Sequence, residues 1–145
     1  MVIPKDSFRK FFEEHHVLTL ATSVDNNPWC ANCFYAYLPD EVALVFTSDA
    51  DTRHIREALK NPRVAGSVVL ETETVGKIQG LQFTGILAEP VEKDTRDKIR
   101  KRYLKRFPYA AVMKTTLWLL QLNSLKLTDN RLGFGKKMYW DRTGA

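Results

Sequence analysis

The residues best suited to binding chemistry lie in the stretch 44–60. An apolar run at 44–46 is followed by hydroxyl and cationic side chains, namely Thr47, Ser48, Thr52, Arg53 and His54. A helix with an apolar stripe is expected to begin near Thr52, and a helix N-terminus carries free N–H groups and about half a positive charge. Hydroxyls and cations at such a position indicate a phosphate site. The alternative is an ordinary capped helix with Asp51 or Thr52 as the N-cap.

The stretch contains neither a P-loop nor a GxGxxG motif, so the phosphate is expected to belong to something other than a Walker-type nucleotide. No Ser-His-Asp signature, HExxH motif or paired-carboxylate pattern supports hydrolase chemistry. His15 and His16 are neighbours and do not converge on a helix, so they are not expected to form a metal site.

Length and composition bound the class of protein. A chain of 145 residues with 44% hydrophobic residues is expected to form one domain, residues 1–145, with a core of its own. No run approaches the ~18 apolar residues of a membrane span, and the N-terminus lacks the apolar segment of a secretory signal. We therefore expect a cytoplasmic protein that does not associate with membranes.

The net charge of +5 is concentrated in one segment. Residues 91–107 contain eight Lys or Arg against three Asp or Glu, and the rest of the chain is balanced. A solvated amphipathic helix is the favoured interpretation, and a face for nucleic acid or another anionic partner is the alternative.

Cys30 and Cys33 form a CxxC motif, which can indicate a metal half-site or a redox pair. No second CxxC completes a zinc site, and no metal is expected. The motif lies within a strand-like run, in which positions i and i+3 point to opposite faces. We therefore expect two free thiols, buried or half-buried.

The order of predicted elements indicates an antiparallel barrel with helices across its openings. Helices are predicted at 4–15, 52–60 and 93–106. Strands are predicted at 17–23, 29–37, 42–47, 63–70, 78–89 and 116–123, with short terminal strands at 125–128 and 138–140. Gly80 and Gly85, inside one strand, are expected to mark bulges or close backbone approach.

These motifs, in this order, resemble the FMN-binding split barrels of the pyridoxamine 5'-phosphate oxidase-like superfamily. The matching segments are LATSVDNNPWCANCFY, VFTSDADTRH and KNPRVAGSV. The chain is more closely similar to the YhbP-like subfamily at 29–35, 52–54, 64–66, 80–85, 106–110 and 128–140. The resemblance implies a mainly β (α+β) fold, a six-stranded antiparallel split barrel with short helices that is usually a homodimer with FMN at the subunit interface. It brings no settled activity.

The resemblance also implies a set of cofactor-binding residues. The FMN phosphate would lie at Thr47, Thr52 and His54, where His54 replaces the lysine of relatives and lacks its fixed charge. The missing charge could come from Arg53, Lys136 or Lys137. The flavin ring would lie along the second strand at Trp29, Cys30, Ala31 and Asn32. Gln82 replaces a basic residue of relatives. Trp140 could stack on the ring, or it belongs to the core or to an interface.

Three functions remain open at this stage. The first is a dimeric FMN-dependent oxidoreductase of unknown substrate, and the second is a non-catalytic binder of flavin, haem or another planar anion. The third is a nucleic-acid or protein-binding module that acts through the basic helix. Gly133 and Gly135 would let the 128–140 segment close over the cofactor, possibly from the second subunit, or the segment is a solvated turn.

A homodimer is also expected from the residues themselves. Large apolar side chains crowd onto few strands, and a small barrel is not expected to turn them all inward. These residues are Phe34, Tyr35, Tyr37, Trp118, Leu119 and Leu120.

Overall fold

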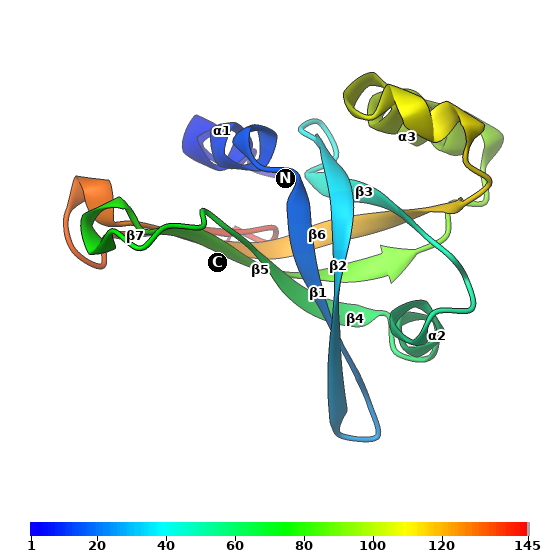
Figure 1. Ribbon diagram of the computed structural model, residues 1–145, viewed down its shortest axis with the longest axis horizontal. Coiled ribbons are helices and arrows are strands. Elements are labelled where there is room, and N and C mark those ends of the chain that lie inside the picture. Colours follow the sequence, from blue (N-terminus) through cyan, green and yellow to red (C-terminus); the bar gives the residue numbers. More distant parts are fainter. Residues whose placement is uncertain (145) are drawn as a thin grey trace.

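Six antiparallel strands close into a barrel, and a seventh strand is attached at its side (Figure 1). The computed structural model describes residues 1–144. The strands are β1 (Val17–Val24), β2 (Asn27–Leu38), β3 (Ala43–Ser48), β4 (Arg63–Val69), β5 (Gln79–Ala88), β6 (Thr116–Asp129) and β7 (Lys137–Asp141). Their order is β3-β2-β1-β4-β5-β6-β7, and an additional pairing of β3 with β6 closes the ring. The six-stranded split barrel expected from the sequence is therefore confirmed.

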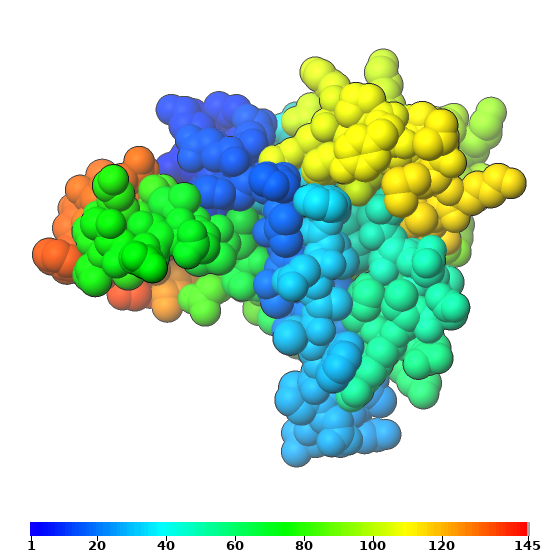
Figure 2. Space-filling model, viewed as in Figure 1, coloured from blue at the N-terminus to red at the C-terminus, as the bar shows by residue number. Residues whose placement is uncertain are grey.

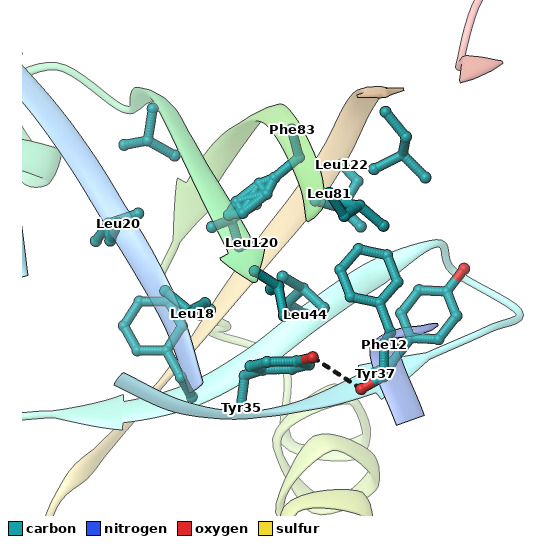
Figure 3. Packing of buried hydrophobic residues seen from close by; sticks show 14 of the residues in the cluster. Phe12, Leu18, Leu20, Tyr35, Tyr37, Leu44, Leu81, Phe83, Leu120 and Leu122 are labelled. Atoms are coloured by element: carbon teal, nitrogen blue, oxygen red, sulfur yellow. Dashed lines mark hydrogen bonds between the residues drawn. The ribbon is translucent and has the colours of Figure 1, made fainter. Parts of the chain in front are cut away.

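Three helices cover the barrel. They are α1 (Asp6–Glu14), α2 (Arg53–Lys60) and α3 (Lys93–Arg106). Of the short 3-10 turns, η1 (Val75–Lys77) and η3 (Asn130–Leu132) connect strands, and η2 (Pro108–Val112) connects α3 to β6. Phe8, Phe11 and Phe12 of α1 and Ile55 of α2 enter the main core. Figure 3 shows this packing, in which the Tyr35 hydroxyl donates to the carbonyl of Phe12 at 2.8 Å.

The expectation of exposure is wrong for four of the six large strand side chains from which the sequence predicts a dimer. Tyr35, Tyr37, Trp118 and Leu120 are buried within one chain, Leu119 is half-buried, and Phe34 is exposed at 48%. The reason is that both faces of these strands are covered. Alternate residues enter the barrel, and the others pack under α3, where Ile99 and Tyr103 lie in a second apolar cluster with the partly buried Leu119.

The basic helix α3 uses part of its charge internally. The Arg102 guanidinium donates to the carbonyl of Tyr37 at 2.9 Å. Arg106 donates to the carbonyls of Phe12, Glu13, His15 and Tyr35, and so fixes the end of α1 against β2. These two arginines are structural, which leaves a smaller set of exposed cations on the helix.

The strand that follows α3, β6, is longer than predicted. Residues 116–129 form one continuous strand, where the sequence indicated two separated near Ser124. The register shows the cause, because Gly85 faces Leu122 while Thr84 faces Ser124. Asn123 is thus the extra residue of a β-bulge, which bends the strand without ending it.

Gly85 and Gly80 play different roles in β5. A Cβ at Gly85 would lie 2.3 Å from the carbonyl oxygen of Gln121, whereas nothing lies within 4 Å of a Cβ at Gly80. Close backbone approach is therefore confirmed at Gly85 and is absent at Gly80.

We predict that Gly85→Ala lowers the free energy of unfolding by about 2–3 kcal/mol, because the clash is with backbone that must shift. Gly80→Ala is the matched control and should change stability by less than about 0.5 kcal/mol. Urea unfolding followed by circular dichroism measures both. Equal stability of the two variants would contradict the assigned close approach.

Candidate functional site

The end of β3 and the start of α2 bring Ser48, Thr52 and His54 together, whereas Thr47, on the other face of β3, contacts Tyr103 of α3. Thr52 is the N-cap residue of α2, but its hydroxyl donates to the carbonyl of Asp49 at 2.8 Å and makes no cap bond to the helix. The first turn of α2 contains no acidic residue. The helix therefore presents N–H groups without a side-chain cap or a nearby carboxylate in its first turn, which favours an anion there.

Ser48 and His54 form the closest polar contact of this cluster. The hydroxyl of Ser48 lies 2.7 Å from Nε2 of His54, and the hydroxyl of Thr52 lies 3.4 Å from the same nitrogen. Burial lowers the pKa of His54 from its ordinary value. The imidazole is therefore neutral at pH 7 and contributes hydrogen-bonding capacity without a fixed charge.

Two contacts hold the exposed side chain of Arg53. Its Nε donates to Oε2 of Glu57 at 2.8 Å, and its guanidinium carbon lies 4.0 Å from the ring centre of Trp29. Thr22 donates to the other oxygen of Glu57 at 2.8 Å, and the bond from Arg53 holds the pKa of Glu57 below its usual value. These contacts link the β1–β2 hairpin to α2, and Glu57 offsets the charge of Arg53.

The outer half of β2 has a free edge. Residues 27–34 pair with β1, but β3 pairs only with residues 35–38. No described strand pairs with the second edge of residues 27–33, so alternate N–H and C=O groups there point away from β1. Trp29, Cys30, Ala31 and Asn32 all lie along this edge. Figure 2 shows the outer half of the hairpin projecting from the body of the molecule.

The two faces of this edge differ. Trp29 faces Arg53 of α2, whereas Asn32 lies on the outer face, where it accepts a hydrogen bond from Thr19 at 2.8 Å. The structure thus places Trp29 beside Arg53, in the first turn of α2. Cys30 and Asn32 belong to the outer sheet surface.

Gln82 and Trp140 lie on a different part of the sheet. Both line a surface hollow of about 760 Å³ on β4, β5, β6 and β7, together with Lys126 and Tyr139. Gln82 is exposed, whereas Trp140 is buried to 9% exposure and donates from Nε1 to the carbonyl of Val2 at 2.7 Å. Within one chain Trp140 thus belongs to the core and to the wall of this hollow.

The outer sheet surface connects Asn32 with this hollow. The strand registers align one cross-strand row, Asn32, Thr19, Ser67, Gln82, Lys126 and Tyr139. A neighbouring row of small side chains consists of Cys30, Ala21, Ala65, Thr84, Ser124 and Asp141. A second hollow of about 610 Å³ shares Ala65 and Thr84 with the first. We call this continuous surface the outer trough.

Lys136 and Lys137 lie far from the hydroxyl cluster within one chain. Ser48 pairs with Thr116 at one end of β6, whereas Lys137 pairs with Thr128 toward the other end. At ~3.3 Å per residue, that part of β6 spans roughly 35–40 Å. Figure 1 accordingly shows the β7 end and α2 at opposite sides of the molecule. These lysines can reach such a cluster only in another copy of the chain.

The lysines sit in a well-braced projection, residues 130–137 together with η1, which we call the lobe. Asn130 donates to the carbonyl of Val75 at 2.9 Å and accepts from the N–H of Gly135 at 3.0 Å. Lys137 donates to the carbonyl of Gly135 at 2.9 Å. Gly133 and Gly135 adopt positive φ, a conformation that glycine tolerates best.

Several residues of the site escaped the sequence analysis. Glu57 could have been found, because Arg53 and Glu57 have the i, i+4 spacing of a helical ion pair. Tyr103, whose hydroxyl lies 3.1 Å from that of Thr47, and Lys126 carry no local signal. Their positions depend on long-range packing that only the folded chain defines.

Comparison with known proteins places the fold and these motifs in a family. The family model described as pyridoxamine 5'-phosphate oxidase matches residues 4–127. The chain belongs to the pyridoxamine 5'-phosphate oxidase-like family. A UPF0306 protein of Photorhabdus laumondii is 42% identical over 134 residues, which cover 92% of each chain.

Solved structures share the fold at low sequence identity. A haem-binding protein from Mycobacterium smegmatis superimposes with a TM-score of 0.76 at 18% identity, over 97% of this chain and 60% of that one. This chain therefore spans less than two thirds of that protein. An FAD-binding protein from Mesorhizobium loti gives a TM-score of 0.70 at 15% identity, over 86% of this chain and 94% of that one. Within residues 1–144, no helix has both the length and the apolar character needed to cross a bilayer.

The two cysteines behave as separate free thiols. Cys30 is exposed and Cys33 is buried, and burial raises the pKa of Cys33 to about 11. Strand alternation sends their side chains to opposite faces, which disfavours a disulfide between them.

We predict that a maleimide modifies one thiol per native chain at pH 7.5, and both thiols only after unfolding, because a buried thiol with a raised pKa forms little thiolate. Mass spectrometry counts the adducts, and Cys30→Ala should abolish native labelling while Cys33→Ala leaves it intact. Rapid labelling of Cys33 in the folded protein would contradict this assignment.

Proposed function

We propose that this protein binds FMN and is a flavin-dependent oxidoreductase. The observation that carries the proposal is the Ser48, Thr52 and His54 cluster at the uncapped start of α2, beside the free edge of β2. The cluster has the donors that a phosphate needs, and the edge has unpaired backbone groups that a planar heterocycle can hydrogen-bond. Membership of the pyridoxamine 5'-phosphate oxidase-like family supports a flavin as that ligand.

Different residues would bind the phosphate and the ring of FMN. In this proposal Ser48, Thr52 and His54 hold the phosphate, while the free edge from Trp29 to Asn32 orients the ring. A bound FMN supplies the hydride or electron chemistry, and the chain binds, orients and tunes it. The described cluster contains no carboxylate in contact with His54, so proton transfer to the substrate is assigned to solvent or to the substrate itself.

A non-catalytic binder of flavin or haem is the second candidate. The neutral imidazole of His54 and the fold shared with a haem-binding protein favour it. Absorbance of the purified protein separates the ligands, because flavin and haem have distinct bands. Anaerobic reduction by NAD(P)H then separates an oxidoreductase from a passive flavin carrier.

We also propose a homodimer that forms through the outer trough. Its rows of small side chains make a broad, shallow surface that a second copy can cover. This surface is proposed as the interface in place of the strand residues from which the sequence predicts a dimer, because most of those residues are buried within one chain. In such a dimer the lobe of one copy can supply Lys136 and Lys137 to the hydroxyl cluster of the other. The cluster needs this charge because Glu57 offsets that of Arg53.

We predict that Thr52→Ala combined with His54→Ala weakens FMN binding by about 2–4 kcal/mol, because both side chains contact the phosphate. Flavin fluorescence titration measures the affinity. Riboflavin, which has no phosphate, should bind parent and variant alike, and the exposed pair Thr74→Ala with His16→Ala is the matched control. Unchanged FMN affinity in the first double variant would sink the phosphate assignment.

We predict that two defective chains restore each other's binding if each site needs two copies. One chain carries Thr52→Ala with His54→Ala, and the other carries Lys136→Ala with Lys137→Ala. Random mixing by co-refolding should regain about a quarter of the parent FMN sites, because each mixed dimer of a two-fold assembly has one intact site. No recovery in a mixture that sediments as a dimer would contradict the assembly of each site from two copies.

A further inference from the structure

His54 is surrounded by groups that accommodate either of its protonation states. Its Nε2 lies 2.7 Å from the hydroxyl of Ser48 and 3.4 Å from that of Thr52. The Ser48 hydroxyl can donate or accept, so this closer contact does not fix a proton on the ring, whereas the Thr52 hydroxyl gives its proton to the carbonyl of Asp49 and can only accept from Nε2. The neutral imidazole and the Ser48 hydroxyl carry two mobile protons between them, and a protonated imidazole would bring a third.

The neighbouring charged groups leave the imidazole without a counter-ion. On α2, Arg53 and Glu57 are paired with each other. In the connecting turn, Asp49 and Asp51 are exposed and make no ion pair within the described residues. On the side of β6 and α3 the titratable groups are the exposed Lys114, which precedes the strand, and Tyr103, whose pKa is raised by burial.

Burial lowers the pKa of His54 from its ordinary value. A helix N-terminus acts in the same direction, because its partial positive charge disfavours a cation. In the free protein at neutral pH, the cluster thus has no net charge of its own to offer a dianion. A bound anion reverses this balance, since a negative charge within a few ångströms favours imidazolium.

We propose that the cluster is a proton-coupled anion site, in which binding of a phosphate or carboxylate is accompanied by uptake of one proton by His54. The imidazolium then donates from both ring nitrogens, and the Ser48 hydroxyl is released to donate to the anion. This inference rests on the proposed function for the identity of the natural ligand, and it adds a regulation of that site by pH.

The sign of the pH dependence follows from linkage. His54 has a higher pKa in the complex than in the free protein, so affinity is greatest below the free pKa and falls as pH rises through the range between the two values. The decline approaches about tenfold per pH unit within that range and stops above the pKa of the complex. The effect is absent when residue 54 does not titrate.

Sulfate is the probe that tests this directly, because it stays doubly charged over the range in which a phosphate monoester gains its second proton near pH 6. The imidazole NMR resonances of the three histidines are followed against pH in sulfate and in chloride of equal ionic strength. We expect the pKa of His54 to rise in sulfate relative to chloride. A His54 pKa that is the same in both salts overturns the proposal.

The affinity measurements with FMN and haem use the variant His54→Gln, which keeps a hydrogen-bond donor without titrating. His16→Gln is the matched control. FMN and haem affinities are measured from about pH 5 to pH 8 for each protein. We expect the parent-to-His54→Gln affinity ratio to fall at least fivefold over this range for the ligand whose anionic group occupies the cluster. A ratio independent of pH for both ligands overturns the proposal.

These results separate the inference from the proposed function. A protein that shows the sulfate effect but binds neither FMN nor FAD refutes the flavin proposal and leaves the proton-coupled anion site standing. A protein that binds FMN with the same pH profile in parent and His54→Gln refutes the proton coupling and leaves the flavin proposal standing. A fall of the affinity ratio for haem alone assigns the anion to a propionate carboxylate.

Discussion

The pairing of β3 with β6 is the constraint on which the rest of the structure depends. It joins segments on the order of seventy residues apart and converts a sheet of strands into a closed ring. Its final pair, Ser48 with Thr116, lies at the entrance to the hydroxyl cluster, and the indole of Trp118 donates to the carbonyl of Ser48 at 2.8 Å. The position of the candidate site is therefore a property of barrel closure and of no single local motif.

The chain uses its cations in two distinct ways. Arg106 and Arg142 each donate to several backbone carbonyls and hold elements together, a role that suits a guanidinium because its charge is permanent and its donors are spread in a plane. Within residues 1–144, no hydrogen bond joins Ser48, Thr52 or His54 to such a permanent charge. The nearby guanidinium of Arg53 contacts Glu57 and the face of Trp29 instead. The charge that an anion would meet must come from a proton or from another chain.

The local features of this molecule could be predicted from the sequence, because their causes are local. The start of α2, the turn at Asp25 and Asn26 and the opposite orientations of Cys30 and Cys33 follow from residue type and strand or helix periodicity. The barrel itself is predicted by the family motifs. The resemblance implies only that Trp29 and Arg53 belong to one cofactor site. It does not predict that Arg53 stacks on Trp29.

The features that the sequence did not reveal arise from long-range geometry. The resemblance places Lys136 and Lys137 at the same site as His54, but the length of β6 keeps these lysines away from His54 within one chain. Gln82 and Trp140 lie around a hollow of their own. From the sequence, the large apolar side chains of these strands, Tyr35 and Trp118 among them, are too numerous to fit inside a small barrel. The sequence does not show that α3 covers the outer face of the same strands.

The free edge of β2 has a consequence for the state of the protein without its ligand. An unpaired strand edge is a template for pairing with another chain, and natural sheets protect such edges with proline, charge or a covering element. Here Pro28 removes one donor, and the stack of Arg53 on Trp29 covers part of the strand. A flavin lying along the remaining backbone would occupy the groups that otherwise recruit a neighbouring strand. Ligand loading would then protect against aggregation, and the empty protein would be the form that assembles edge to edge on prolonged storage.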